Sequence, residues 1–189
     1  MSQPNIREII KQELVKCVKD AKYFMKKYCV VQHPMRGKVP FHLYPYQERC
    51  VDDFTRDDKY CVILKSRQLG LSTLSAGYAL WLMTFHSDKN ILVIATKQET
   101  AKNLVAKVRV MHNELPSWLK NKCVEDNKLS LKYENGSQIK AVSSNSDSAR
   151  SEALSLLIID EAAFIDKIDE IWTSAQQTLA TGGRAIMLS

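Results

Sequence analysis

The sequence predicts an α/β protein with a central, mostly parallel sheet and helices on both faces. Apolar runs of strand length alternate with segments of helical periodicity, and this alternation is typical of strand–helix–strand units with right-handed crossovers. Residues 90–95 and 156–159 are apolar almost throughout, as strands buried on both faces are. Between residues 122 and 142 the period changes to two, which predicts a small antiparallel β insertion.

Composition limits the classes of protein to consider. The chain of 189 residues carries a net charge of +6, which permits a polyanionic partner without requiring one. The five cysteines are widely spaced and form no C-x-x-C pair, a pattern expected of a reduced, cytosolic protein. No apolar run is long enough to cross a bilayer, and the N-terminus is polar. We therefore expect a soluble protein that is not secreted and has no membrane partner.

The individual elements follow from periodicity and from turn residues. An amphipathic helix is expected over residues 6–27, followed by a loop containing Pro34, Gly37 and Pro40. Further helices are expected at 45–54, 74–85, 97–115 and 169–179, and strands at 60–64, 90–95, 122–126, 129–133, 138–142, 156–159 and 184–188. We divide the chain into an N-terminal helix and lead-in (1–43) and a core (44–189), and the core ends as though the sheet were cut.

The core is organised around a loop between the strand at 60–64 and the helix at 74–85. A loop in this place directs the free N–H groups and the positive dipole end of the helix toward a phosphate. The usual fingerprint is G-x-x-x-x-G-K-[ST], in which backbone amides hold phosphates, the lysine reaches the terminal phosphate and the hydroxyl binds Mg²⁺. The candidate nucleotide-binding residues are Lys65, Ser66, Arg67, Gln68, Leu69, Gly70, Leu71, Ser72 and Thr73.

Two positions of the loop depart from the fingerprint. Lys65 occupies the first glycine position, and Leu71 occupies the lysine position. The flexible stem of Lys65 can still bring an ammonium to the β- and γ-phosphates, because a point charge needs reach more than a fixed orientation. The alternative is a basic strand end beside an ordinary turn.

Two adjacent acids, Asp160 and Glu161, follow the apolar run that begins at residue 156. Ligands of open α/β sheets bind at the carboxyl ends of the strands. There Asp160 can hold Mg²⁺ while Glu161 orients and deprotonates a water molecule. The alternative is a strand that runs into a solvated helix start. Gln47, in the first turn of the helix at 45–54, offers both a donor and an acceptor to an adenine edge, unless it is simply a surface glutamine.

Taken together, these motifs resemble the N-terminal ATPase domain of the large terminase subunit of tailed double-stranded-DNA phages, and most closely the myovirus type. The matching pieces occur in the family's order along nearly the whole chain: Tyr-Phe-Met-Lys-Lys-Tyr-Cys at 23–29, Tyr46-Gln47, Ser66-Arg67-Gln68-Leu69-Gly70, Asn135-Gly136-Ser137, Ser143-Ser144 through Arg150, and Asp160-Glu161-Ala162-Ala163-Phe164-Ile165. Leu71 departs from the myovirus pattern, whereas Lys65 matches the shifted-lysine variant of other terminases.

The resemblance implies roles for particular residues. Gln47 would contact adenine, Arg67 would act as a phosphate sensor or cis-acting finger, and Arg150 would act as a trans-acting finger on a neighbouring subunit. Asp160, with Ser72, would hold Mg²⁺, and Glu161 would be the catalytic acid. The family's nuclease lies in a C-terminal domain that this sequence does not contain.

The resemblance also implies partners and a cellular setting. The expected cofactors are ATP and Mg²⁺, and the expected partners are double-stranded DNA, the portal protein of the prohead and the small terminase subunit. The chain would form a homo-oligomeric ring when assembled and would be a monomer as an isolated fragment, in the cytoplasm of the infected host cell.

The sequence predicts a P-loop ATPase of the additional-strand, catalytic-glutamate type, and the resemblance implies that its hydrolysis of ATP powers DNA packaging. Two other interpretations stay open. The first is one RecA-like lobe of a DNA or RNA helicase, because Gln47 before a P-loop and Asp-Glu-Ala-Ala after a strand also occur there. The second is a nucleotide-binding assembly module that lost catalysis with the lysine at position 71.

Overall fold

A computed structural model describes residues 5–144 and 153–189. The helices are α1 (Ile6–Lys19), α2 (Ala21–Tyr28), α3 (Pro45–Thr55), α4 (Leu71–Phe85), α5 (Gln98–Glu114), the short 3₁₀ helix η2 (Ala162–Phe164) and α6 (Ile168–Leu179). The strands are β1 (Val30–His33), β2 (Gly37–Pro40), β3 (Tyr60–Ile63), β4 (Asn90–Ala95), β5 (Cys123–Asp126), β6 (Ser130–Tyr133), β7 (Gln138–Ser143), β8 (Leu156–Asp160) and β9 (Arg184–Leu188). None of the helices described is long and apolar enough to cross a membrane.

The main sheet has seven strands in the order β3-β9-β8-β4-β7-β6-β5. Parallel pairing runs from β3 to β7, and β6 and β5 continue the sheet in antiparallel pairing. The predicted antiparallel ribbon is therefore an extension of the same sheet. Ala95 at the end of β4 pairs with Asp160 at the end of β8. This register brings the polar residues that follow the two strands to one edge of the sheet.

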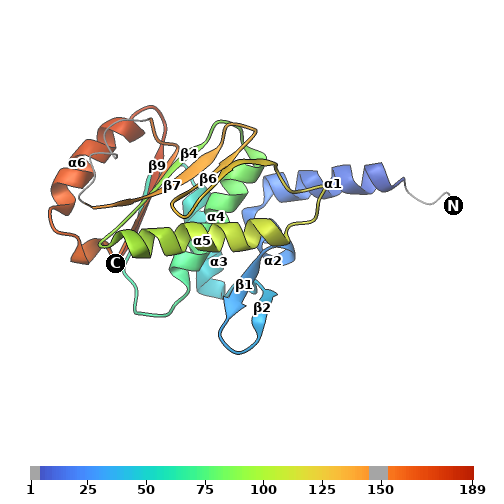
Figure 1. The fold of residues 1–189 in the computed structure, drawn as a ribbon, viewed down its shortest axis with the longest axis horizontal. Helices are drawn as coiled ribbons and strands as arrows, with labels where there is room; N and C mark the ends of the chain where they lie inside the picture. Colours follow the sequence, from blue (N-terminus) through green and yellow to red (C-terminus); the bar gives the residue numbers. More distant parts are fainter. Residues whose placement is uncertain (1–4, 145–152) are drawn as a thin grey trace.

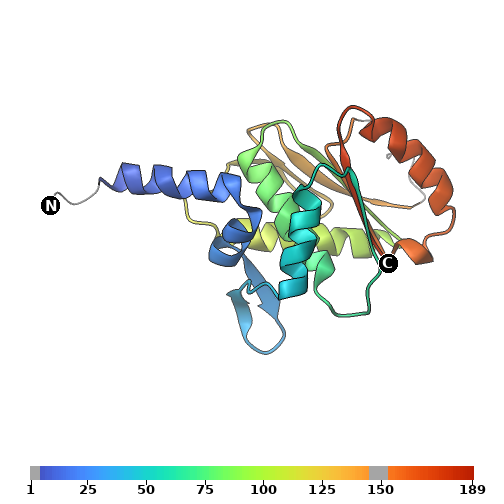
Figure 2. The same ribbon diagram turned by 180° about the vertical axis from the view of Figure 1, so that it is seen from behind.

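Helices cover the sheet on both faces, as the continuous apolar strands predict. Successive side chains of a strand point to opposite faces, so Ile91 and Val93 enter the core beneath α4 and α5, whereas Leu92 and Ile94 enter the core beneath α6. Figures 1 and 2 show the sheet between α6 and the α4–α5 pair. The α/β prediction is thus confirmed.

The N-terminal segment differs from the prediction in two ways. The helix expected over residues 6–27 is divided at Asp20, whose carboxylate accepts hydrogen bonds from the amides of Lys22 (2.8 Å) and Tyr23 (3.0 Å) and so begins α2 as an N-cap. The loop expected around Pro34 is instead a two-stranded hairpin, β1–β2. The helix α1 projects from the body (Figure 2), while α2 packs into the α4–α5 core. The domain boundary near residue 43 stays a prediction.

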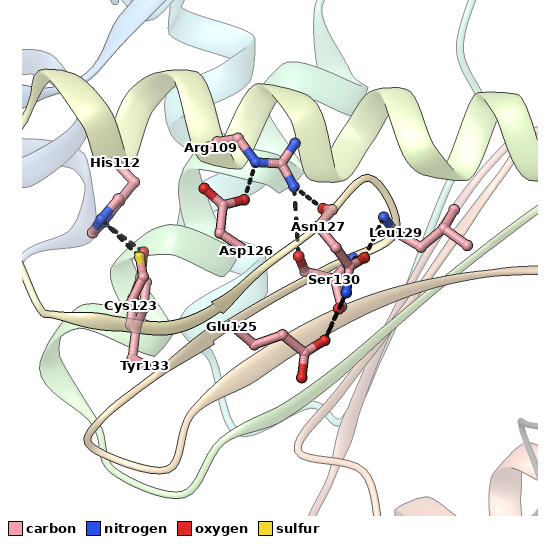
Figure 3. Close-up of polar contacts among 9 residues, drawn as sticks. All are labelled: Arg109, His112, Cys123, Glu125, Asp126, Asn127, Leu129, Ser130 and Tyr133. Carbon is pink, nitrogen blue, oxygen red and sulfur yellow. Dashed lines mark hydrogen bonds and ion pairs between the residues drawn. The ribbon is translucent and has the colours of Figure 1, made fainter.

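Arg109 fixes α5 to the turn between β5 and β6 (Figure 3). Its Nε donates to Asp126 Oδ1 at 2.5 Å, and its Nη2 donates to the carbonyl oxygen of Asn127. Asn127 in turn caps the turn, because its Oδ1 accepts from the amide of Leu129 at 2.9 Å. A planar guanidinium that binds both a carboxylate and a carbonyl holds one orientation. The helix is therefore anchored at this point of the sheet.

A buried histidine provides a second anchor one turn further along α5. His112 is 3% exposed. Its Nδ1 lies 2.8 Å from the Tyr133 hydroxyl on β6, and its Nε2 lies 3.2 Å from Cys123 Sγ on β5 (Figure 3). Burial, followed by the charge of Lys120, lowers the pKa of His112 from 6.5 to about 4. The imidazole is therefore neutral at pH 7.

This buried imidazole predicts a loss of stability in mild acid. Below pH 6.5 the unfolded chain takes up a proton that folded His112 binds only near pH 4. Its contribution to the free energy of unfolding should therefore fall by up to about 3 kcal/mol across this window. Chemical denaturation of wild type and His112→Gln at a series of pH values measures it: the difference between them should shrink as the pH falls. His42→Gln, at an exposed histidine, should keep the wild-type slope. A His112→Gln curve parallel to the wild type would contradict the prediction.

Candidate nucleotide-binding site

The predicted phosphate loop connects β3 to α4 at the carboxyl edge of the sheet. The amide of Lys65 donates to the carbonyl oxygen of Ser189 at 2.6 Å, so the β3–β9 pairing continues into the loop. Gln68 (φ 64°) and Gly70 (φ 70°) both adopt left-handed backbone conformations, which turn the chain back toward the sheet. Gly70 is the N-cap of α4, and its carbonyl accepts the first helical hydrogen bond from Leu74 at 2.9 Å.

Two side chains of α3 brace the loop. The Tyr46 hydroxyl (2.9 Å) and Gln47 Nε2 (3.0 Å) both donate to the carbonyl oxygen of Leu69. Gln47 Oε1 accepts from the amide of Tyr44 at 3.0 Å and thereby caps α3. A Cβ at Gly70 would lie 2.9 Å from Gln47 Nε2. Position 70 therefore requires glycine both for its backbone conformation and for this close contact.

Asp160 joins the end of β8 to the start of α4. The residue is 5% exposed. Oδ2 accepts a hydrogen bond from Ser72 Oγ at 2.5 Å, and Oδ1 accepts one from the amide of Glu161 at 3.0 Å. The ammonium of Lys65 lies 3.9 Å from Oδ1. A hydroxyl, a carboxylate and a lysine from distant parts of the sequence thus meet at one point.

The structure gives a reason for the displaced lysine. Leu71 is 3% exposed and belongs to the core beneath α4 and α5. A leucine at that position packs in the core and supplies no charge to a phosphate. The side chain of Lys65 is 17% exposed and lies against Asp160. The cation therefore comes from the opposite end of the loop.

Glu161 projects from a strained position beside Asp160. Its backbone is left-handed (φ 57°), uncommon for a residue other than glycine, and such conformations cluster at functional sites. The Thr96 hydroxyl donates to Glu161 Oε2 at 2.8 Å. Thr96 is not among the residues that the sequence motifs predict. Its position directly after β4 could have indicated that it lies near Glu161, because the ends of β4 and β8 are paired.

The oxygen atoms of Ser72 and Asp160 are of the kind that Mg²⁺ prefers. Within residues 5–144 and 153–189, no cluster of three or more His, Cys, Asp or Glu side chains is placed to hold a metal ion. Mg²⁺ differs from metals bound by all-protein cages, because it commonly takes one or two carboxylates together with phosphate oxygens and water. The residues present fit that mode.

The remaining candidates within the described residues lie on the loop or in the first turn of α4. Ser66, Arg67 and Gln68 are exposed on the loop, and the side chain of Thr73 is half-buried in the first turn of α4. The structure therefore leaves Arg67 free to approach a ligand over the loop. Arg150 lies outside the described residues.

Comparison with known structures supports the same fold. The crystal structure of the HK97 bacteriophage large terminase is similar with a TM-score of 0.72 and 19% identity, over 90% of this chain and 37% of that one. The large terminase ATPase domain of Thermus phage P74-26 is similar with a TM-score of 0.62 and 20% identity, over 79% of this chain and 65% of that one. The chain therefore spans just over a third of the HK97 protein, and the TM-scores show that its fold is similar to that of these terminase structures.

A third similar structure is the large terminase of a thermophilic bacteriophage in complex with ADP, with a TM-score of 0.52 and 13% identity, over 94% of this chain and 37% of that one. A family model described as the N-terminal part of the T4likevirus-type terminase large subunit matches residues 62–188. That match covers the loop, Asp160 and Glu161. The chain belongs to the family of T4likevirus-type large terminase subunits, of which it contains the N-terminal region.

Proposed function

We propose that this domain binds ATP with Mg²⁺ and hydrolyses it. The proposal rests on the surroundings of the Asp160 carboxylate at the start of α4. One of its oxygens lies 2.5 Å from the Ser72 hydroxyl, and the other lies 3.9 Å from the Lys65 ammonium. The first amides of α4 face the same point, and a helix N-terminus favours a phosphate. The large terminase of the thermophilic bacteriophage, of similar fold, was solved in complex with ADP, which supports a nucleotide ligand.

The proposed reaction is attack of water on the γ-phosphorus, which breaks its bond to the β,γ-bridging oxygen and releases ADP and inorganic phosphate. Lys65, Arg67 and the loop amides would neutralise the charge that develops on the phosphate oxygens. Bound Mg²⁺, held by Ser72 and Asp160, would supply further positive charge. Glu161 would orient and deprotonate the water: the Thr96 hydroxyl holds one of its carboxylate oxygens, and the other is left for the nucleophile.

We further propose that the hydrolysis powers translocation of double-stranded DNA into a prohead. Membership of the large terminase family supports this role. The portal protein and the small terminase subunit would be partners, and neighbouring copies would form a ring in which Arg150 acts across the subunit boundary. An arginine supplied by a neighbouring subunit raises the rate of nucleotide hydrolysis about a thousandfold or more. The isolated domain is accordingly expected to be a slow ATPase.

Substitutions of the two adjacent acids, Asp160 and Glu161, should affect ATP binding and ATP hydrolysis separately. Glu161→Gln removes the base but keeps the shape, so multiple-turnover phosphate release should fall at least about a hundredfold while ATP affinity stays close to wild type. Asp160→Asn should instead weaken Mg²⁺-dependent ATP binding. Glu170→Gln, at an exposed position of α6, is the control and should behave as wild type. Equal loss of ATP affinity in both site variants would refute the assigned roles. A wild-type protein that binds ATP but releases no phosphate would favour the assembly-module interpretation.

The displaced lysine can be tested against Arg67. Lys65→Ala should lower the rate of phosphate release at least about a hundredfold, because it removes the ammonium nearest Asp160. Lys59→Ala, an exposed lysine just before the opposite end of β3, should leave the rate unchanged. Full activity of Lys65→Ala would show that Arg67 alone neutralises the phosphate.

A contact between Gln47 and adenine stays a prediction, and the structure offers a second role for this residue. Gln47 is 3% exposed and braces Leu69. If bracing is its role, Gln47→Ala should weaken binding of ATP and of inorganic tripolyphosphate by similar factors, because both ligands need the loop. Isothermal titration of the two ligands measures this. A loss confined to ATP would instead assign Gln47 to the base.

A further inference from the structure

The helix α1 carries an apolar stripe that is buried at one end and exposed at the other. Ile6, Ile10, Leu14 and Cys17 are spaced by four or three residues and so lie on one face of the helix. Cys17 is buried in the core, and its carbonyl oxygen accepts a hydrogen bond from Trp81 Nε1 at 2.8 Å. Ile6 is 73% exposed. The face that attaches α1 to the body therefore continues beyond the body.

The exposed end of α1 needs an apolar partner. Figures 1 and 2 show its first turns projecting away from the sheet and from the other helices. A helix of 14 residues is only marginally stable in water by itself, because most of the stability of a helix in a protein comes from packing of its apolar face. We therefore expect the stripe to be covered when the protein is assembled.

The charged side chains of α1 limit what that partner can be. The exposed charges of the helix are mostly positive, with Arg7, Lys11 and Lys19 against Glu8. Its other acid, Glu13, is already paired with a lysine of α2. Pairing of α1 with the α1 of another copy would bring like charges together, which is unfavourable. The stripe is therefore suited to a surface that is both apolar and acidic.

An exposed apolar surface lies on the edge strand β3. Tyr60 and Val62 pair in register with Ala185 and Met187 of β9, so these four side chains lie on the same face of the sheet. Ala185 and Met187 belong to the core beneath α6, whereas Val62 is 69% exposed. The helix α6 thus covers this face as far as β9 and leaves much of the edge strand open.

A cavity of about 250 Å³ lies between β3 and α6. Its lining is mostly apolar and includes Tyr60, Val62, Ile168, Trp172 and Met187. Asp169 of α6 lines the cavity as well. Two exposed acids, Asp57 and Asp58, come shortly before β3 in the sequence, with Lys59 as the intervening cation. The cavity therefore combines apolar walls with an acidic border, the two properties that suit α1.

We propose that α1 of one copy of this chain docks against β3 and α6 of the next copy, with Ile6 and Ile10 over the cavity. One copy cannot make this contact within itself, because α1 and α6 lie at opposite ends of the molecule (Figure 1). A contact between two different surfaces repeats from copy to copy and closes into a ring when the rotation allows it. The inference goes beyond the proposed ATP hydrolysis and does not rest on it.

The contact is tested by sedimentation velocity of the purified chain over a range of concentrations. A single helix makes a small interface, so the wild-type chain should be monomeric when dilute and should associate at high concentration. Ile6→Asp and Val62→Asp, each at an exposed side chain, should each weaken the association at least about tenfold, because the contact would bury an aspartate among apolar side chains.

Two exposed valines provide matched controls. Val15 lies two residues from Cys17 and so on another face of α1, and Val124 lies on β5, the opposite edge strand of the sheet. Val15→Asp and Val124→Asp should associate as the wild type does. An effect of either control equal to that of Ile6→Asp or Val62→Asp would overturn the inference, because the association would then depend on exposed apolar side chains in general.

A mixture of the two blocked variants tests whether the two surfaces bind each other. Ile6→Asp keeps its cavity and Val62→Asp keeps its α1, so the mixture should form a dimer although neither variant associates alone, and the dimer shows that both are folded. A mixture that stays monomeric would overturn the inference. Association lost in Ile6→Asp but kept in Val62→Asp would also overturn it, because α1 would then bind another surface.

The wild-type chain gives the last outcomes. A chain that stays monomeric up to about 1 mM, where even weak contacts form, would overturn the inference. ATP binding should be the same in wild type, Ile6→Asp and Val62→Asp, so the proposed function does not depend on this result. A wild-type chain that associates as predicted but binds no ATP would instead refute the proposed function and leave the docking contact in place.

Discussion

The contact between Ser72 and Asp160 is the interaction on which the site depends. It connects the first turn of α4 to the last residue of β8 at 2.5 Å, although the two residues are far apart in the sequence. Because Asp160 is buried and also faces Lys65, loss of this contact would leave the Oδ2 atom of a buried carboxylate without the hydroxyl donor it has in the structure. The loop, the strand end and the cation are therefore fixed together or not at all.

The sheet makes this contact possible. Apolar side chains on both faces of β4 and β8 bury the two strands between α6 and the α4–α5 pair, and burial on both faces fixes their register. That register places Thr96 and Glu161 within 2.8 Å of each other just beyond the paired strand ends. From this edge α5 runs to the antiparallel strands β5 and β6. Arg109 and His112 attach the helix to these strands. The geometry of the polar edge is thus a consequence of apolar packing.

Periodicity predicted the α/β class and most elements, because long apolar runs and helical stripes are strong local signals. It failed at Asp20, where a single capping side chain divides a continuous helical stripe, and at the β1–β2 hairpin, where turn residues hid two short strands. Motif spacing singled out Lys65, Ser72 and Asp160, which the structure brings together. Thr96 carries no motif, and its relation to the site arises from strand register, which a sequence does not display.

The most direct measurement is a crystal structure of the domain with Mg²⁺ and a non-hydrolysable ATP analogue. The account predicts that Ser72 and Asp160 hold the Mg²⁺ ion and that the Lys65 ammonium contacts the β- or γ-phosphate. Leu71 should remain in the core. A nucleotide bound away from the loop, or a metal ion that does not contact Asp160, would contradict the account.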